Sequence, residues 1–353
     1  MALRAGICGI DSFYSTAFLG ACRSNANLTP VACTSPGASP VETPGQAEAR
    51  RAKVAAWAKE RGLAAYDSVE EMVRKESLDV VFVASADNVK AAHAAEAADA
   101  GAHVFLAKPM CLTLQDADRI IEAGKRGGAV ISALMPGRYD GAIRSLYNEV
   151  AQGAVGDVLT VRAWVQHGCF GPGMSFEGSP EFGPEQGGIP LSLGFYAADL
   201  ILWLIDSKPL RAYAEYDNLA TPHSIWMDTG KGVVRFADGR MGSMDIIFNV
   251  ECGAPPWELE VVGTKGIARA HLDVYEGIIW RSGARPGVLY RNQNDVIGAA
   301  VSAFVKACLE CKKPEVTAEH GRNVLELSLA WKRSAETHAP VYFPLEGKSG
   351  QVA

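Results

Sequence analysis

The sequence predicts an α/β protein of two domains, a doubly wound parallel sheet followed by an α+β domain with a largely antiparallel, open-faced sheet. Three observations predict this fold. Short apolar runs alternate with helical patterns up to about residue 134, as in repeated β-α-β units. Strand-like runs dominate after about residue 157. The 353 residues can build two sizeable cores, and we place the domains at 1–136 and 137–353.

The first domain is expected to alternate strands with helices. Gly62 suits a helix C-cap, and Ser68 with Glu71 suits a capping box. The Pro-, Gly- and Ser-rich stretch 35–47 reads as a loop. Right-handed crossovers place helices on both faces of the sheet. We predict strands at 3–10, 28–34, 78–84, 103–107 and 129–134, and helices at 12–24, 48–61, from 68, at 89–100 and at 114–126.

The second domain is expected to be rich in strands that alternate apolar and polar residues. Asp238-Gly239 lies between two such runs and indicates a hairpin. Helical patterns occur at 142–152, 189–205, 295–311 and 318–337. We predict strands at 158–167, 210–216, 224–227, 232–236, 241–248, 259–263, 267–271 and 277–281.

Composition narrows the class of protein. The net charge is −6 and there is no long basic run, which argues against a nucleic-acid partner. Strand-like sequence begins almost at once, and no uninterrupted apolar run approaches membrane-spanning length, so we expect neither a signal peptide nor a membrane span. The eight cysteines are scattered, and the pair Cys308 and Cys311 lacks two further ligands, so we expect no metal site and a reducing cytoplasm.

Lys108 follows directly after the predicted strand 103–107 and precedes Pro109. A lysine at the carboxyl end of a buried parallel strand lies where open α/β sheets bind ligands. The proline fixes φ and removes a donor, so the backbone at Lys108 should be held firmly. The alternative is a solvated loop lysine.

The turn after the first strand holds only part of a dinucleotide-binding pattern. The window 9–14 reads Gly-Ile-Asp-Ser-Phe-Tyr, with the first of three expected glycines. Asp11 stands where the backbone should approach a pyrophosphate, and its charge repels an anion. The alternative is that Asp11 or Ser12 is the N-cap of an ordinary helix.

The end of the second strand bears on the choice of cofactor. Thr34 and Ser35 stand where an acid would bind the adenosine ribose. Small hydroxyls followed by Arg50, Arg51 and Lys53 suit a 2′-phosphate, which favours NADP over NAD. A solvated basic helix face is the alternative interpretation.

Several stretches, taken together and in order, resemble the Gfo/Idh/MocA oxidoreductases. They are residues 78–85, 100–109, 187–188, 262–266 and 329–337. The resemblance covers nearly the whole chain. It implies an N-terminal Rossmann domain, a C-terminal open-faced sheet, an active site between them and a homo-oligomer, either a dimer or a tetramer.

The resemblance also implies roles for single residues. Lys108 falls on the lysine of the family's Glu-Lys-Pro motif, with Ala107 in place of the glutamate. Ser192 takes the position of the family's aspartate and Tyr196 that of its histidine, four residues apart on one helix face. Tyr196 would then be the acid or base, and Lys108 would orient the reacting oxygen. The alternative is a packed aromatic residue beside a small one.

The remaining candidates complete the expected site. The expected substrate-binding residues are Arg138, Tyr139, His167 and Ser192. The expected cofactor-binding residues are Gly9, Ile10, Ser12, Phe13, Ser35, Arg51, Ser85, Asn88 and Lys108.

Two functions remain open at this point. The first is an NAD(P)-dependent oxidoreductase that transfers hydride to or from a small-molecule substrate, namely a sugar, cyclitol or related hydroxy or keto compound. The second is a lyase, an isomerase or a non-catalytic binding subunit on the same scaffold. This second hypothesis is supported by Asp11, Tyr14 and Ser192, because each departs from the family pattern.

Overall fold

The computed structural model describes residues 2–37, 42–168, 187–219, 227–250, 257–271, 276–290 and 295–345. Its contacts divide the chain into two compact units. The first comprises Met1–Leu134 and Ile297–Arg322, and the second comprises Met135–Val296 and Asn323–Ala353. The sequence assigned all of 137–353 to one domain, whereas the structure groups 297–322 with the first unit.

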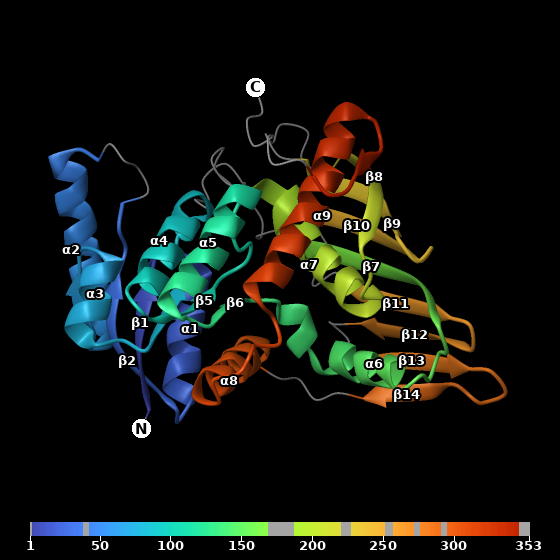
Figure 1. The fold of residues 1–353 in the computed structure, drawn as a ribbon, viewed down its shortest axis with the longest axis horizontal. Helices are drawn as coiled ribbons and strands as arrows, with labels where there is room; N and C mark the ends of the chain where they lie inside the picture. The colour runs from blue at the N-terminus through green and yellow to red at the C-terminus, as the bar shows by residue number, and fades with distance from the viewer. Residues whose placement is uncertain are drawn as a thin grey trace. The chain divides into compact units, whose positions relative to one another are not determined.

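The first unit is built on a six-stranded parallel sheet in the order β3-β2-β1-β4-β5-β6. This order runs outward in both directions from β1, as in a doubly wound sheet. Figure 1 labels β1, β2, β5 and β6 of this sheet, in the blue to green part of the chain. The predicted fold class is confirmed. The strands are β1 (Leu3–Cys8), β2 (Leu28–Thr34), β3 (Ala64–Tyr66), β4 (Val80–Val83), β5 (His103–Leu106) and β6 (Ile131–Ala133).

Helices connect these strands, as the alternating sequence pattern predicts. They are α1 (Phe13–Ser24), α2 (Pro44–Arg61), α3 (Val69–Glu76), α4 (Asp87–Asp99) and α5 (Leu114–Gly127). The prediction for the start of α2 is wrong by four residues. Thr43 forms a capping box with Gln46, and Pro44 occupies the first turn, where a missing N–H costs nothing.

Helix α8 (Val296–Leu309) joins the first unit through an aromatic cluster. The Phe304 ring lies 5.1 Å from that of Phe105 and 6.4 Å from that of Phe82. Phe18 of α1 lies 5.5 Å from Phe105, and all four rings are buried. Each such side chain removes a large apolar surface from water. This burial explains why a helix so late in the chain packs with the first sheet.

The second unit is built on a nine-stranded sheet in the order β14-β13-β12-β11-β7-β10-β9-β8-β15. Strands β7 and β10 pair in parallel and the other pairings are antiparallel. The strands are β7 (Val158–Gly168), β8 (Pro209–Asp217), β9 (Thr229–Phe236), β10 (Met241–Val250), β11 (Glu258–Gly263), β12 (Gly266–His271), β13 (Glu276–Arg281), β14 (Gly287–Tyr290) and β15 (Val341–Tyr342).

Short helices and α7 lie in the same unit. A 3-10 helix, η1 (Pro136–Tyr139), precedes α6 (Gly141–Ala151) and α7 (Gly188–Ile205). Helix α9 (Ala318–Thr337) begins in the first unit and continues in the second. The predicted hairpin at Asp238-Gly239 is confirmed, with Gly239 at a φ of 91°. Most of the strand predicted at 224–227 lies outside the described residues, and β14 was not predicted.

Helix α7 forms part of the core of the second unit. Its 18 residues have a mean hydropathy of 1.7, so by length and composition alone it could cross a membrane. Ser192 and Asp199 interrupt the apolar run of this helix, so the expectation that no uninterrupted apolar run approaches membrane-spanning length stands. In the structure 83 % of the helix is buried. A helix that is apolar on all sides is suited to such a buried place in a protein core.

Candidate functional site

The turn after β5 carries Lys108. Ala107 donates its backbone N–H to the carbonyl oxygen of Val83 at 2.9 Å, which continues the pairing of β5 with β4. Lys108 follows half-buried, and its peptide bond to Pro109 is cis. Strand β5 is an inner strand of a parallel sheet. Lys108 therefore lies at the carboxyl-terminal end of the strands, where ligands bind in such folds.

Lys90 of α4 forms a side-chain hydrogen bond with this turn. Its side chain is 2 % exposed, and its Nζ lies 2.8 Å from the carbonyl oxygen of Pro109 and 2.6 Å from Oδ1 of Asp87. Sequence reasoning missed Lys90, because a lysine near the start of an alanine-rich helix normally lies in solvent.

Gly9 directly follows β1 at the same carboxyl-terminal end of the sheet strands. Its φ of 86° lies in the left-handed region, and its N–H donates to the carbonyl oxygen of Thr34 at 2.8 Å. A Cβ on Gly9 would lie 2.5 Å from the backbone nitrogen of Ser85. The first glycine of the expected turn is therefore required by the close approach of the backbone after β4.

Ser12 is the N-cap of α1, and its Oγ accepts the N–H of Tyr14 at 3.0 Å. Of the two caps considered from the sequence, Ser12 is the one observed. Ile10 is buried and Phe13 is 69 % exposed. An exposed aromatic ring in the first turn of α1 offers a surface on which a flat ring could stack.

The charged residues considered for a 2′-phosphate are all close to carboxylates. Lys53 pairs with Asp11 at 2.5 Å, so a lysine faces the acid that stood in place of the second glycine. Arg51 lies 3.6 Å from Asp67. Both pairs are exposed to solvent, so each contributes little to the stability of the fold.

Arg50 and the residues after β2 form a second group. Arg50 donates to Glu42 and, at 3.1 Å, to the carbonyl oxygen of Ser35. Thr34 is buried, and its hydroxyl donates to the carbonyl oxygen of Tyr66 at 2.8 Å. The Thr34 hydroxyl is therefore engaged in a hydrogen bond between β2 and β3. Ser35, the next residue after β2, is half-buried.

Ser85 lies in a buried polar chain at the end of β4. Its Oγ lies 2.8 Å from Nδ1 of His93 and 3.3 Å from Sγ of Cys8. Burial lowers the pKa of His93 to about 4 and raises the pKa of Cys8 to about 12. Both groups are therefore neutral near pH 7, and His93 holds the Ser85 hydroxyl in place. Asn88 lies half-buried in the first turn of α4.

In the second unit, Tyr196 is buried on α7 with 9 % of its surface exposed. Its ring centre lies 4.5 Å from that of Trp257, at an interplanar angle of 58°. The indole N–H of Trp257 donates to the carbonyl oxygen of Gln166 in β7. The structure therefore brings Tyr196 to the end of β7, where His167 pairs by its backbone with Phe248. The side chain of His167 lies outside the described residues.

Two other α7 residues share the region of Tyr196. Ser192 lies one turn before it and is half-buried, while Asp199 lies nearly one turn after it. Asp199 forms an ion pair with Arg138 of η1 at 2.7 Å, and both side chains are 3 % exposed. The guanidinium of Arg138 also lies 4.8 Å from the ring centre of Trp203. Arg138 thus joins η1 to α7, a contact that the sequence analysis did not foresee.

Tyr139 lies next to this pair and is half-buried. The guanidinium of Arg144 stands 5.6 Å from its ring centre. Sequence reasoning missed the contacts of Trp257 with Tyr196 and Gln166, and it did not pair Asp199 with Arg138. Neither contact follows from local spacing, since Gln166 and Trp257 are 91 residues apart.

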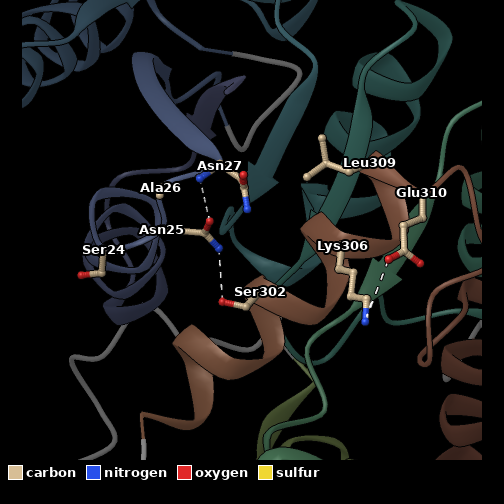
Figure 2. A pocket seen from close by; sticks show the side chains of 8 residues that line it. All are labelled: Ser24, Asn25, Ala26, Asn27, Ser302, Lys306, Leu309 and Glu310. Carbon is tan, nitrogen blue, oxygen red and sulfur yellow. Dashed lines mark hydrogen bonds and ion pairs between the residues drawn. The ribbon is translucent and has the colours of Figure 1, made fainter. Parts of the chain in front are cut away.

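A hollow of about 460 Å³ lies elsewhere in the first unit. It is near the start of β2, at the sheet edge opposite Lys108 and Gly9, and none of the predicted site residues line it. Figure 2 shows the Asn25 amide donating to Ser302 and Lys306 facing Glu310. Its lining residues are Ser24, Asn25, Ala26, Asn27, Ser302, Lys306, Leu309 and Glu310.

Among the described residues, no three His, Cys, Asp or Glu side chains gather as metal ligands.

Comparison with known families identifies the scaffold. A family described as "Oxidoreductase family, NAD-binding Rossmann fold" matches residues 3–134, and the GFO/IDH/MocA C-terminal domain matches residues 143–269. The chain belongs to the Gfo/Idh/MocA family. It is an oxidoreductase by this membership, and its Rossmann domain is of the NAD-binding kind.

Similar Gfo/Idh/MocA proteins include curated enzymes. The chain is 26 % identical over 292 residues to 1,5-anhydro-D-fructose reductase of Ensifer adhaerens, covering 80 % of this chain and 85 % of that one. It is 24 % identical over 281 residues to myo-inositol 2-dehydrogenase of Thermotoga maritima, covering 77 % and 82 %. A levoglucosan dehydrogenase solved with NADH and levoglucosan shares the fold at a TM-score of 0.82 and 18 % identity, covering 98 % of this chain and all of the other.

Proposed function

We propose that this protein transfers hydride between a nicotinamide cofactor and a hydroxyl or keto carbon of a sugar, an anhydrosugar or a cyclitol. The observation that carries the proposal is Lys108, which stands after an inner strand of a parallel sheet on the Lys-Pro position of its family. The names of the curated relatives, a reductase of an anhydro-sugar and a myo-inositol dehydrogenase, support the substrate class.

Tyr196 is proposed as the acid and base. In the oxidising direction its oxygen takes the proton of the substrate hydroxyl while the hydride leaves the same carbon. Lys108 orients that hydroxyl and stabilises the negative charge that develops on its oxygen. The burial of Tyr196 against Trp257 supports this role, because a water-poor setting strengthens such interactions. When bound, the nicotinamide accepts or donates the hydride at C4.

Ser192, Tyr139, His167 and Arg138 are proposed to position the substrate. Ser192 is favoured by its place one turn from Tyr196 on the same helix face. Arg138 would act through Asp199, because the ion pair encloses its guanidinium. A substrate contact by His167 is supported only by the position of its backbone at the end of β7.

The residues around Gly9 fit a dinucleotide in part. Gly9 keeps the tight turn, Ser12 opens α1, and Ser85 stands beside Gly9 at the end of β4. We propose that Ile10, Phe13 and Asn88 complete this surface and that Ser35 and Arg51 face the adenosine end. The ion pair of Asp11 with Lys53 supports the proposal, since it offsets the carboxylate that would repel phosphate.

Binding and turnover test the proposal directly. Calorimetry with NAD(H) and NADP(H) is expected to show binding of at least one pair. Reduction of 1,5-anhydro-D-fructose and oxidation of myo-inositol or levoglucosan are followed by nicotinamide absorbance. Lys108→Ala and Tyr196→Phe are expected to lower kcat/KM by at least about a hundredfold.

Matched controls are available on the surface of the same units. Lys125→Ala in α5 and Tyr342→Phe in β15 change exposed side chains and should leave turnover unchanged. Absence of any cofactor binding at millimolar concentration would contradict the proposal and favour a redox-neutral or binding role. If Arg51 holds a 2′-phosphate, Arg51→Gln weakens the binding of NADPH and not that of NADH.

We also propose that the protein is a cytoplasmic homo-oligomer, a dimer or a tetramer. The support is one sheet face of the second unit with exposed apolar residues such as Val233 and Met241 among charged ones. Sedimentation analysis tests this, and a monomer at micromolar concentration would contradict it.

A further inference from the structure

Lys90 is a buried lysine whose place in the fold is unusual. It lies in the first turn of α4 and is 1 % exposed. Taking an ammonium group out of water is costly, and a cation near a helix N-terminus is opposed by the helix dipole. An apolar residue of similar size would meet neither cost. The lysine is therefore not explained by the stability of α4.

Two bonds account for the buried charge. The Nζ of Lys90 lies 2.6 Å from Oδ1 of Asp87, which supplies the opposite charge three residues earlier on the same helix. It also lies 2.8 Å from the carbonyl oxygen of Pro109, 19 residues later in the chain. The second bond ties α4 to the residue that directly follows Lys108. A hydrogen bond from a charged donor is among the stronger ones in proteins.

These contacts hold the backbone of Lys108 from both sides. Before it, the N–H of Ala107 is bound to the carbonyl oxygen of Val83. After it, Pro109 has no N–H, so its carbonyl is the polar backbone group by which the turn can be held, and Lys90 binds it. The next two residues, Met110 and Cys111, are fully buried.

We propose that Lys90 is a positioning residue for Lys108. Its ammonium group, neutralised by Asp87, fixes the carbonyl of Pro109 and so sets the direction in which the Lys108 side chain leaves the sheet. The inference rests on the proposed function for the catalytic role of Lys108, and Lys90 itself contacts no substrate in it.

Two substitutions separate this role from simple loss of charge. Lys90→Met removes both the ammonium and the hydrogen bond, whereas Lys90→Gln removes the charge and keeps an N–H donor for Pro109. Both leave Asp87 without its cation. We expect Lys90→Met to lower kcat about ten- to a hundredfold, Lys90→Gln to recover part of that loss, and the KM for cofactor to change less than about threefold in both.

A spectroscopic signal of Lys108 makes the test independent of the substrate. Reductive methylation with ¹³C-formaldehyde gives each accessible lysine an NMR signal, and the Lys108 signal is assigned by its absence in Lys108→Arg. We expect Lys90→Met to change the chemical shift of this signal. Val73→Ala, which shortens a buried side chain in α3, should leave the signal in place.

The outcomes decide the inference. A Lys108 signal and a kcat that are unchanged in folded Lys90→Met would overturn it, as would equal losses in Lys90→Met and Lys90→Gln. If Lys90→Met does not fold, Lys90→Gln is compared with the unmodified protein, and a smaller displacement of the Lys108 signal is expected. If the unmodified protein turns over none of the substrates, the proposed function fails, while the NMR comparison still decides whether Lys90 positions Lys108.

Discussion

Gly9 shows how strongly one residue can depend on its surroundings. Its φ of 86° is rarely adopted by other residues, and a Cβ would collide with the backbone at Ser85. Gly20, in the same first β-α unit, has open space around it and a helical conformation. The two glycines are therefore expected to respond in opposite ways to the same substitution.

Gly9→Ala is expected to destabilise the protein by about 1–3 kcal/mol and to weaken cofactor binding, because both φ and the contact with Ser85 oppose a side chain. Gly20→Ala should stabilise it by about 0.5–1 kcal/mol, because glycine is unfavourable inside an exposed helix. Urea unfolding measures both changes. A loss of stability in Gly20→Ala would contradict this account.

His93 links a residue to the pH dependence of stability. Burial lowers its pKa from 6.5 to about 4. Between these values the unfolded chain binds the proton and the folded chain does not, so stability falls as the pH is lowered from 6.5 to 4. The loss from this group is on the order of 3 kcal/mol.

His93→Gln should flatten this part of the profile, because glutamine keeps a polar contact for Ser85 and does not titrate. Burial also lowers the pKa of His103, which adds a loss of the same sign to both proteins. Urea unfolding at several pH values measures the difference. Parallel profiles for the two proteins would show that His93 is not buried as a neutral group.

At the scale of elements, a buried ion pair holds η1 against α7. The Nε of Arg138 donates charge-assisted hydrogen bonds of 2.9 and 3.1 Å to the two carboxylate oxygens of Asp199 within a buried region, and Trp203 faces the guanidinium. Leu200 of the same helix packs 3.2 Å from the Cβ position of Gly137. The pair fixes the rotation of α7 and thereby the side on which Tyr196 and Ser192 lie.

Arg138→Met is expected to cost about 3–5 kcal/mol, because the buried carboxylate of Asp199 loses the guanidinium that neutralises its charge. The double variant Arg138→Met/Asp199→Leu should recover most of this stability, since no charge remains buried. Denaturant unfolding tests both. Asp99→Asn, which breaks the exposed pair with Arg126, serves as a control with a much smaller effect. A double variant less stable than the single one would contradict the account.

At the scale of the whole molecule, the chain forms two units that do not follow its order. Helix α8 and the residues up to 322 belong with the first unit although about 160 residues separate them from β6. A ligand of the first unit therefore acts on a fold assembled from two distant segments, and its binding should stabilise both together.

Cofactor binding gives a test at this scale. A cofactor at a hundred times its Kd is expected to raise the free energy of unfolding by about 2.7 kcal/mol, provided that it does not bind the unfolded chain. Differential scanning fluorimetry with NADH and NADPH shows this as a rise of a few degrees in Tm. Gly9→Ala should reduce the rise at the same cofactor concentration, and an equal rise would separate cofactor binding from the Gly9 turn.

The sequence by itself determined the alternation of the first sheet, the place of Lys108 after β5, the cap at Gly62 and the family. The first three depend on periodicity and on turn chemistry within a few residues, which any segment displays alone, whereas the family rests on the resemblance of several stretches taken in order. Only the tertiary structure decided the burial of Lys90, the pairing of Arg138 with Asp199, the contact of Trp257 with Tyr196 and the unit to which α8 belongs. Each joins segments distant in sequence, and which partners meet depends on packing of the folded chain, which local pattern does not encode.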